Sequence, residues 1–178
     1  MKSLIFGLAA SVLAITVFAN TESPYAGQEI REIKALSQQE IEAYLNGKGL
    51  GYAKAAELNQ YPGPRHVLDL GSELVLTEDQ TTRTQVVFDA MEAQAITFGK
   101  QLVDKERELD QRFASGSIDK SALKTLLPQI GAIQAKIRFV HLNAHLEQRT
   151  ILTKHQIKLY EQLRGYGTTH NSDHDHSH

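Results

Sequence analysis

The pattern Leu-Thr-x-x-Gln occurs twice in this chain, 76 residues apart, and each copy has the composition of a helix start. A threonine at the N-cap can accept a hydrogen bond from the backbone N–H three residues later, and a glutamine at that position can bond back to the N-cap N–H. The preceding leucine can pack on the first turn as a hydrophobic staple. The residues of the two copies are Leu76, Thr77, Gln80, Leu152, Thr153 and Gln156. Ser37 and Glu40 offer the same chemistry, so the sequence predicts three helix starts and no catalytic group at any of them.

Two long apolar patterns predict two long helices. Apolar residues recur three and four positions apart from Phe88 to Phe113, with one position skipped at Lys105, and again from Leu126 to Ala144. Ser and Gly residues at 115–117 separate the patterns, and two long helices joined by so short a turn must lie antiparallel. Shorter helical segments are predicted at 37–45, 52–59, 66–76 and 153–163. No segment alternates with a strand-like period, so we expect an all-α fold: a long antiparallel helical hairpin with shorter flanking helices.

The N-terminus has the pattern of a secretory signal peptide at residues 1–19. Lys2 precedes an apolar run from Leu4 to Phe18, and Ala19 fits the position before the cleavage site. The run is short for a membrane span of about 20 residues, although an uncleaved anchor is the alternative interpretation. We therefore expect export, cleavage after Ala19 and no stable membrane insertion of the mature chain.

The remaining chain divides into three parts by composition. Residues 20–36 contain Pro24 and Gly27 and are predicted to form a flexible mature N-terminus. Residues 37–166 carry the helical patterns and form the predicted domain, and residues 167–178 form a disordered tail rich in His and Asp.

Composition excludes several kinds of site. The chain has no cysteine, which rules out disulfides, thiolate metal ligands and a cysteine nucleophile. Residues 1–19 contain one lysine and no acid, so the mature chain would carry 18 Lys and Arg against 21 Asp and Glu. That balance argues against a nucleic-acid partner.

Taken together, the signal peptide, the all-helical pattern, the lack of cysteine and the two Leu-Thr-x-x-Gln copies resemble the Spy/CpxP family over residues 37–166. The resemblance implies a bent helical hairpin that forms a cradle-like homodimer in the periplasm. It implies an ATP-independent chaperone or a modulator of envelope stress, whose partners would be non-native periplasmic proteins or an envelope-stress sensor. The family also includes heavy-metal-responsive members, so a periplasmic metal sensor or buffer is the alternative function.

Histidines are the candidate metal ligands. His141 and His145 are one helical turn apart, a spacing that lets both imidazoles bind one ion. The tail adds His170, His174, His176 and His178, and a tract of this kind can bind zinc, copper or nickel. The alternative is a structural role for the helical pair and no specific role for the tail. No cofactor is required by either function, and a divalent metal is the one candidate.

Catalytic motifs are not recognisable in the sequence. Leu142 stands where a His-Glu-x-x-His protease has its glutamate, and the glycine-rich run Gly47–Gly51 lacks the ending of a phosphate loop. No nucleophile elbow is present. We therefore expect a binding protein and not an enzyme.

Overall fold

The computed structural model describes residues 23–166, and in these residues the secondary structure is entirely helical. The chain divides into two compact units, Met1–Ile30 and Arg31–His178, and all six helices belong to the second. They are α1 (Gln38–Leu45), α2 (Lys54–Glu57), α3 (Pro64–Asp69), α4 (Glu78–Ala114), α5 (Lys120–Ile151) and α6 (Lys154–Leu163). The predicted all-α class is confirmed. The predicted signal peptide and the histidine tail lie outside the described residues.

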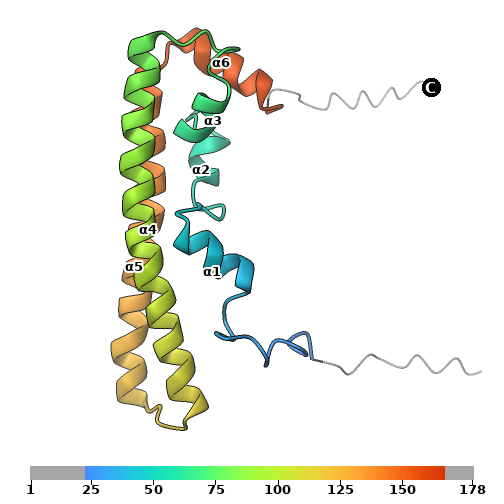
Figure 1. The fold of residues 1–178 in the computed structure, drawn as a ribbon, viewed down its shortest axis with the longest axis vertical. Coiled ribbons are helices and arrows are strands. Elements are labelled where there is room, and N and C mark those ends of the chain that lie inside the picture. The colour runs from blue at the N-terminus through green and yellow to red at the C-terminus, as the bar shows by residue number, and fades with distance from the viewer. Residues whose placement is uncertain (1–22, 167–178) are drawn as a thin grey trace, which may run out of the picture. The chain divides into compact units, whose positions relative to one another are not determined.

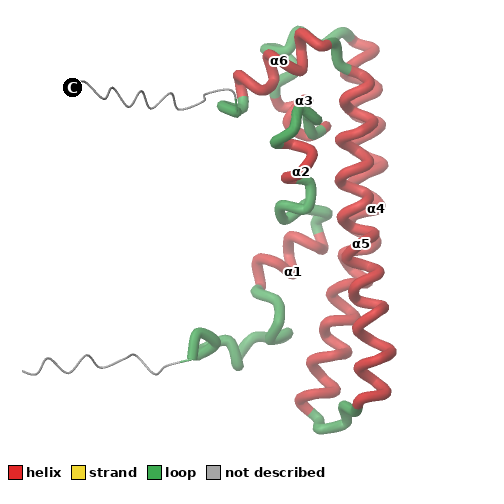
Figure 2. The backbone as a smooth tube through the Cα atoms, turned by 180° about the vertical axis from the view of Figure 1, so that it is seen from behind, coloured by secondary structure: helices red, strands yellow, loops and turns green. Residues whose placement is uncertain are grey.

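The long helices α4 and α5 lie side by side (Figures 1 and 2). Helix α4 ends because Gly116 adopts a φ of 66°, which lets the N–H of Ser117 donate to the carbonyl oxygen of Arg112 at 3.0 Å. Helix α5 then begins at once, since the Asp119 carboxylate accepts a hydrogen bond from the N–H of Ala122 at 2.7 Å. None of the helices in residues 23–166 is both long and apolar enough to cross a membrane.

The apolar stripe predicted on α5 is its buried face. All six positions are buried, at Leu126, Ile130, Ile133, Ile137, Val140 and Ala144. On α4, Ala95 and Leu102 are buried as predicted, whereas Phe113 is exposed because it lies at the last turn of the helix. The other predicted positions, Phe88, Met91, Phe98 and Leu109, are partly buried. The 4-3 spacing therefore gives the packed face of α5 in full and that of α4 only in part.

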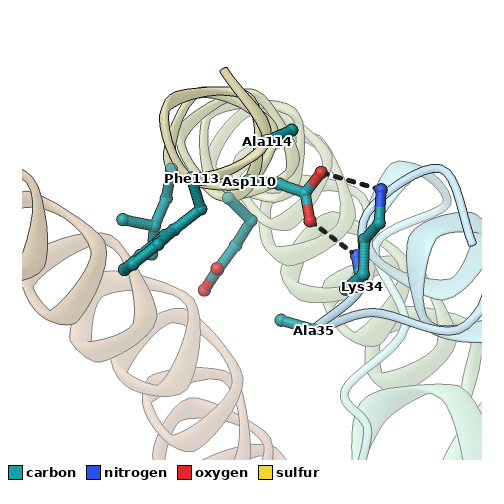
Figure 3. Close-up of a pocket in the computed structure, with 7 residues that line it drawn as sticks. Lys34, Ala35, Asp110, Phe113 and Ala114 are labelled. Carbon is teal, nitrogen blue, oxygen red and sulfur yellow. Dashed lines mark hydrogen bonds and ion pairs between the residues drawn. The ribbon is translucent and has the colours of Figure 1, made fainter. Parts of the chain in front are cut away.

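The segment before α1 belongs to the core. Residues 20–36 were predicted to be flexible, but Ile33 is completely buried and packs with Ile41, Tyr44 and Leu102. The segment is also fixed to α4, because the Lys34 backbone N–H donates to Asp110 Oδ1 at 3.0 Å and its ammonium to Oδ2 at 3.3 Å (Figure 3). We call residues 31–36 the strap. Its two large apolar residues, Ile33 and Leu36, give no periodic pattern, so the sequence did not indicate that the strap is packed.

The chain between α1 and α4 differs from the prediction in detail. A helix was expected at 66–76, but α3 begins at Pro64 and ends at Asp69. Proline stops the preceding helix and also suits the first position of the next one, where its missing N–H would be unpaired anyway. Beyond α3, Val75 adopts a φ of 50°, which is strained for a β-branched residue and directs the chain into the N-cap of α4.

The two motif copies meet at the junction of α4 and α6. Both form the predicted capping boxes, as does Ser37 with Glu40. The side chains of Gln80 and Gln156 are buried and bond to each other, with Nε2 to Oε1 distances of 2.9 and 3.0 Å. Each amide also donates to a backbone carbonyl, Gln80 to Ile151 at 3.0 Å and Gln156 to Leu74 at 3.1 Å. Because each Oε1 also accepts from its own threonine N–H, both amides use their donors and acceptors fully.

Candidate functional site

The two candidate ligands on α5 are buried side chains that face loops. His141 is 5% exposed and His145 is 7% exposed. A Cβ at Gly49 would lie 3.3 Å from His141 Nδ1, and a Cβ at Gly63 would lie 2.9 Å from His145 Cε1. The imidazoles thus occupy space that side chains at these two glycines would fill, which explains why the loops lack side chains there.

A hydrogen bond fixes the tautomer of His145. Its Nδ1 lies 2.7 Å from the carbonyl oxygen of Tyr61. A carbonyl oxygen can only accept, so Nδ1 carries the proton, and Nε2 of the neutral ring keeps its lone pair. This backbone support is the arrangement commonly found behind a metal-binding histidine.

Glu57 connects this region to α6. Its Oε1 accepts hydrogen bonds from the hydroxyls of Tyr160 at 2.6 Å and Tyr166 at 2.9 Å, and Arg164 Nε lies 3.4 Å away. Burial, and then the bond to Glu57, raises the pKa of the Tyr160 phenol, so it remains a donor at neutral pH. Glu57 Oε2 lies 3.7 Å from His145 Nδ1 and has no hydrogen-bond partner within residues 23–166.

His141, His145 and Glu57 line one cavity of about 550 Å³ between α5, α4 and the loops around α2 and α3. His141 Nε2 is buried and, like Glu57 Oε2, has no hydrogen-bond partner in the described part of the chain. Buried polar atoms are normally paired, so these two atoms offer hydrogen-bonding or ligating capacity that a water molecule or a ligand in the cavity can use. Since the lone pair of His145 Nε2 and Glu57 Oε2 are both acceptors, the cavity suits a cation or a hydrogen-bond donor.

The protonation of His141 favours the metal-binding form. Burial, and then the nearby His145, lowers the pKa of His141 from its ordinary value of 6.5. His66 lines the same cavity, and burial followed by the charge of Arg164 lowers its pKa as well. The imidazoles of His141 and His66 are therefore neutral at neutral pH, as a metal ligand must be.

A third metal ligand beside the two histidines is not in place in the described residues. Within residues 23–166, no group of three or more His, Asp or Glu side chains has the geometry to hold a metal ion. The predicted tail ligands His170, His174, His176 and His178 lie outside this range. Sequence reasoning missed Glu57 and Tyr61, because neither is near α5 in sequence and only the fold brings them to His145.

A second cavity, of about 480 Å³, lies beside the strap at Lys34 and Ala35 (Figure 3). Its wall is largely apolar, with Leu109 and Phe113 on α4. Lys34 and Asp110 pair with each other there, so neither charge is available to a ligand. This cavity is a less specific candidate for a ligand site than the cavity lined by His141 and His145, which we call the histidine cavity.

A further feature is an exposed apolar stripe on α5, opposite its buried face. The stripe, which we call the outer stripe, contains one half-buried residue, Leu142, and five exposed ones, Pro128, Ala132, Ala135, Phe139 and Leu146. Phe139 is 66% exposed and Leu146 is 54% exposed. The spacing is 4-3-4-3-4, which is that of a helix-packing seam.

Comparisons of the chain with protein-family models, with curated proteins and with solved structures found no match. The resemblance to the Spy/CpxP family therefore stays a prediction that rests on the two motif copies and the other sequence features given with them.

Stability is expected to depend on pH through His141. Its pKa is lowered in the folded protein, so below pH 6.5 the unfolded chain binds protons that the folded chain does not. The contribution of His141 to the free energy of unfolding should therefore be constant well above that pH and decrease as the pH falls through it toward the lowered pKa. Urea unfolding between pH 5 and pH 8 with a chelator present measures this slope, and His141→Gln should reduce it. His155→Gln, at an exposed position of α6, is the matched control, and an unchanged slope in His141→Gln would contradict the assignment.

Proposed function

We propose that the chain is an exported, ATP-independent binding protein of the Spy/CpxP type, in which a helical hairpin forms a cradle-like homodimer in the periplasm. It would hold partly unfolded proteins or modulate an envelope-stress sensor. The observation that carries the proposal is the outer stripe, since a continuous row of exposed apolar side chains on one helix is typical of a binding surface.

The mechanism follows from mass action. Apolar side chains on a rigid helix bind the apolar segments of a non-native protein, and the bound fraction is withdrawn from aggregation. Helix α5 supplies the rigidity, because its opposite face is buried along six positions of the core. No nucleotide is needed for such reversible binding.

An aggregation assay tests this function. The mature chain from Asn20 should suppress light scattering by a chemically denatured client at equimolar concentration, and the double variant Phe139→Gln and Leu146→Gln should suppress it less. The matched control is Val86→Gln with Leu58→Gln, because these side chains lie outside the stripe and are similarly exposed, at 63% and 60%. Equal suppression by the stripe variant and the wild type would rule out the stripe as the client surface.

A second function is favoured by the histidine cavity. We propose that His141 and His145 bind a divalent metal, zinc, copper or nickel, so that the protein senses or buffers it. The supporting observation is that the hydrogen bond from His145 Nδ1 to Tyr61 leaves Nε2 as a ligand, while His141 Nε2 lacks a partner in residues 23–166. The tail histidines would add a weaker, unselective site, because ordering them costs entropy.

Metal titration by calorimetry separates the two sites. The chain ending at Tyr166 should bind one equivalent, and His141→Gln with His145→Gln should abolish that binding. His155→Gln controls for the loss of an imidazole elsewhere. If the chain ending at Tyr166 binds no metal and the full chain does, the tail is the site and the helical pair has a structural role.

A further inference from the structure

Helix α5 is unusual in its charge. It carries five basic residues and a single acid, Glu147, and the bases are Lys120, Lys124, Lys136, Arg138 and Arg149. None of the five forms an ion pair within residues 23–166. On α4, by contrast, four of the five bases are paired with carboxylates, namely Arg83, Lys105, Arg107 and Arg112. Two of the five lie over aromatic rings instead, Lys136 Nζ 5.4 Å from the centroid of Phe98 and Arg149 Cζ 4.1 Å from that of Tyr61. No carboxylate in the described fold therefore neutralises the positive charge of α5.

Two of these bases border the outer stripe. Lys136 follows Ala135 and Arg138 precedes Phe139, and both are exposed. In a heptad these are the e and g positions, which flank an apolar seam and select the partner helix by charge. The stripe spans 19 residues, or about 27 Å, which is enough for five turns of a partner helix.

The shape of the stripe favours a helix as its occupant. Small residues at Ala132 and Ala135 are followed by the larger Phe139, Leu142 and Leu146. Such a surface offers holes at one end and knobs at the other, which is how two helices interlock.

A second copy of α5 is a poor occupant. In a symmetric contact the same residues from both copies meet, and the centre of the stripe lies between Lys136 and Arg138. An antiparallel pair of copies then places like bases beside each other, and a parallel pair places Lys136 and Arg138 beside Gly131 and Asn143, so neither orientation gives the bases an acidic partner. A partner helix with acidic flanks supplies the carboxylates that Lys136 and Arg138 lack within residues 23–166.

We infer that the outer stripe of α5 binds an amphipathic α-helix whose apolar seam is bordered by Asp and Glu. This helix belongs to a protein partner, and the inference rests on the proposed function because it specifies the class of segment that the binding protein recognises. Lys136 and Arg138 contact the acidic flanks, and Phe139 and Leu146 contact the seam.

Peptide binding tests the inference. Two labelled helical peptides of equal length carry Leu at the a and d positions, with Glu at e and g in one and Lys in the other. Fluorescence anisotropy with the full chain should show the Glu peptide binding at least about tenfold more tightly, as expected for two or more exposed charge pairs. The double variant Phe139→Gln with Leu146→Gln should bind the Glu peptide more weakly by a similar factor. The control variant Val86→Gln with Leu58→Gln should bind it as tightly as the wild type.

A charge reversal makes the test specific. Lys136→Glu with Arg138→Glu, both at exposed positions, should reverse the preference in favour of the Lys peptide. Equal binding of the two peptides, or an unchanged preference in the reversed variant, would overturn the inference. The inference would also fail if analytical sedimentation showed a wild-type dimer that Phe139→Gln with Leu146→Gln converts to a monomer. It would fail as well if the wild type bound anionic vesicles, the same double variant did not, and the Glu peptide did not bind. If the wild type still suppresses client aggregation while neither peptide binds, the proposed function stands and only the inference fails.

Discussion

Replacing Gly99 with alanine is expected to lower the free energy of unfolding by about 2 to 4 kcal/mol, the range of a severe core overpacking. A Cβ at this position of α4 would overlap the carbonyl oxygen of Tyr44 and lie 2.7 Å from its carbonyl carbon. Both are backbone atoms, so α1 must move away from α4 to relieve the overlap. Tyr44 and Ile41 would then lose burial in the core that they share with Ile33. Chemical unfolding, followed by circular dichroism, measures the loss.

Gly131 provides the matched control. It also lies inside a long helix, but a Cβ there would meet no atom within 4 Å among residues 23–166. Gly131→Ala should raise the free energy of unfolding by up to about 1 kcal/mol through helix propensity alone. If both variants gained stability, the close approach of α1 to α4 at Gly99 would be wrong.

Replacing Gln80 with alanine is expected to cost about 2 to 4 kcal/mol, because it leaves several buried groups without partners at once. The substitution removes the donor to Ile151, both bonds to Gln156 and the acceptor for the Thr77 N–H. Glu40→Ala removes the equivalent group from the exposed capping box of Ser37 and should cost only about 1 kcal/mol.

A double-mutant cycle isolates the bond between the two motif copies. Gln80→Ala and Gln156→Ala each remove the same two hydrogen bonds from the remaining amide, so the double variant should lose less stability than the two single losses added together. Additive losses, within error, would show that the two amides do not depend on each other.

Local chemistry in the sequence predicts the helix starts and the long seam well. The three capping boxes and the six buried positions of α5 follow from spacing alone, because such patterns reflect contacts within one helix or along one face. The bond between Gln80 and Gln156 was not predicted, since capping accounts for each glutamine separately. Only the register of α4, α5 and α6 brings the two amides together.

The candidate site shows the same limit. The spacing of His141 and His145 indicates a shared face, and it correctly marks them as a pair. It cannot show that Tyr61 fixes the tautomer of His145 or that Glu57 lies beside it, because 84 and 88 residues separate these partners in sequence. The small α2 and the glycine loops around it gave no strong pattern, yet they form one wall of the cavity.

The two stripes of α5 have the same 4-3-4-3-4 spacing and are offset by two residues, one beginning at Leu126 and the other at Pro128. The angle between the two faces is therefore fixed, at about 200°. An insertion or deletion of one residue between Pro128 and Ala144 would rotate the following part of both faces by about 100°, exposing core side chains and burying outer ones. Substitutions can alter one face without the other, but length changes cannot. Helix α5 should consequently tolerate changes of residue on its outer face far better than any change in its length.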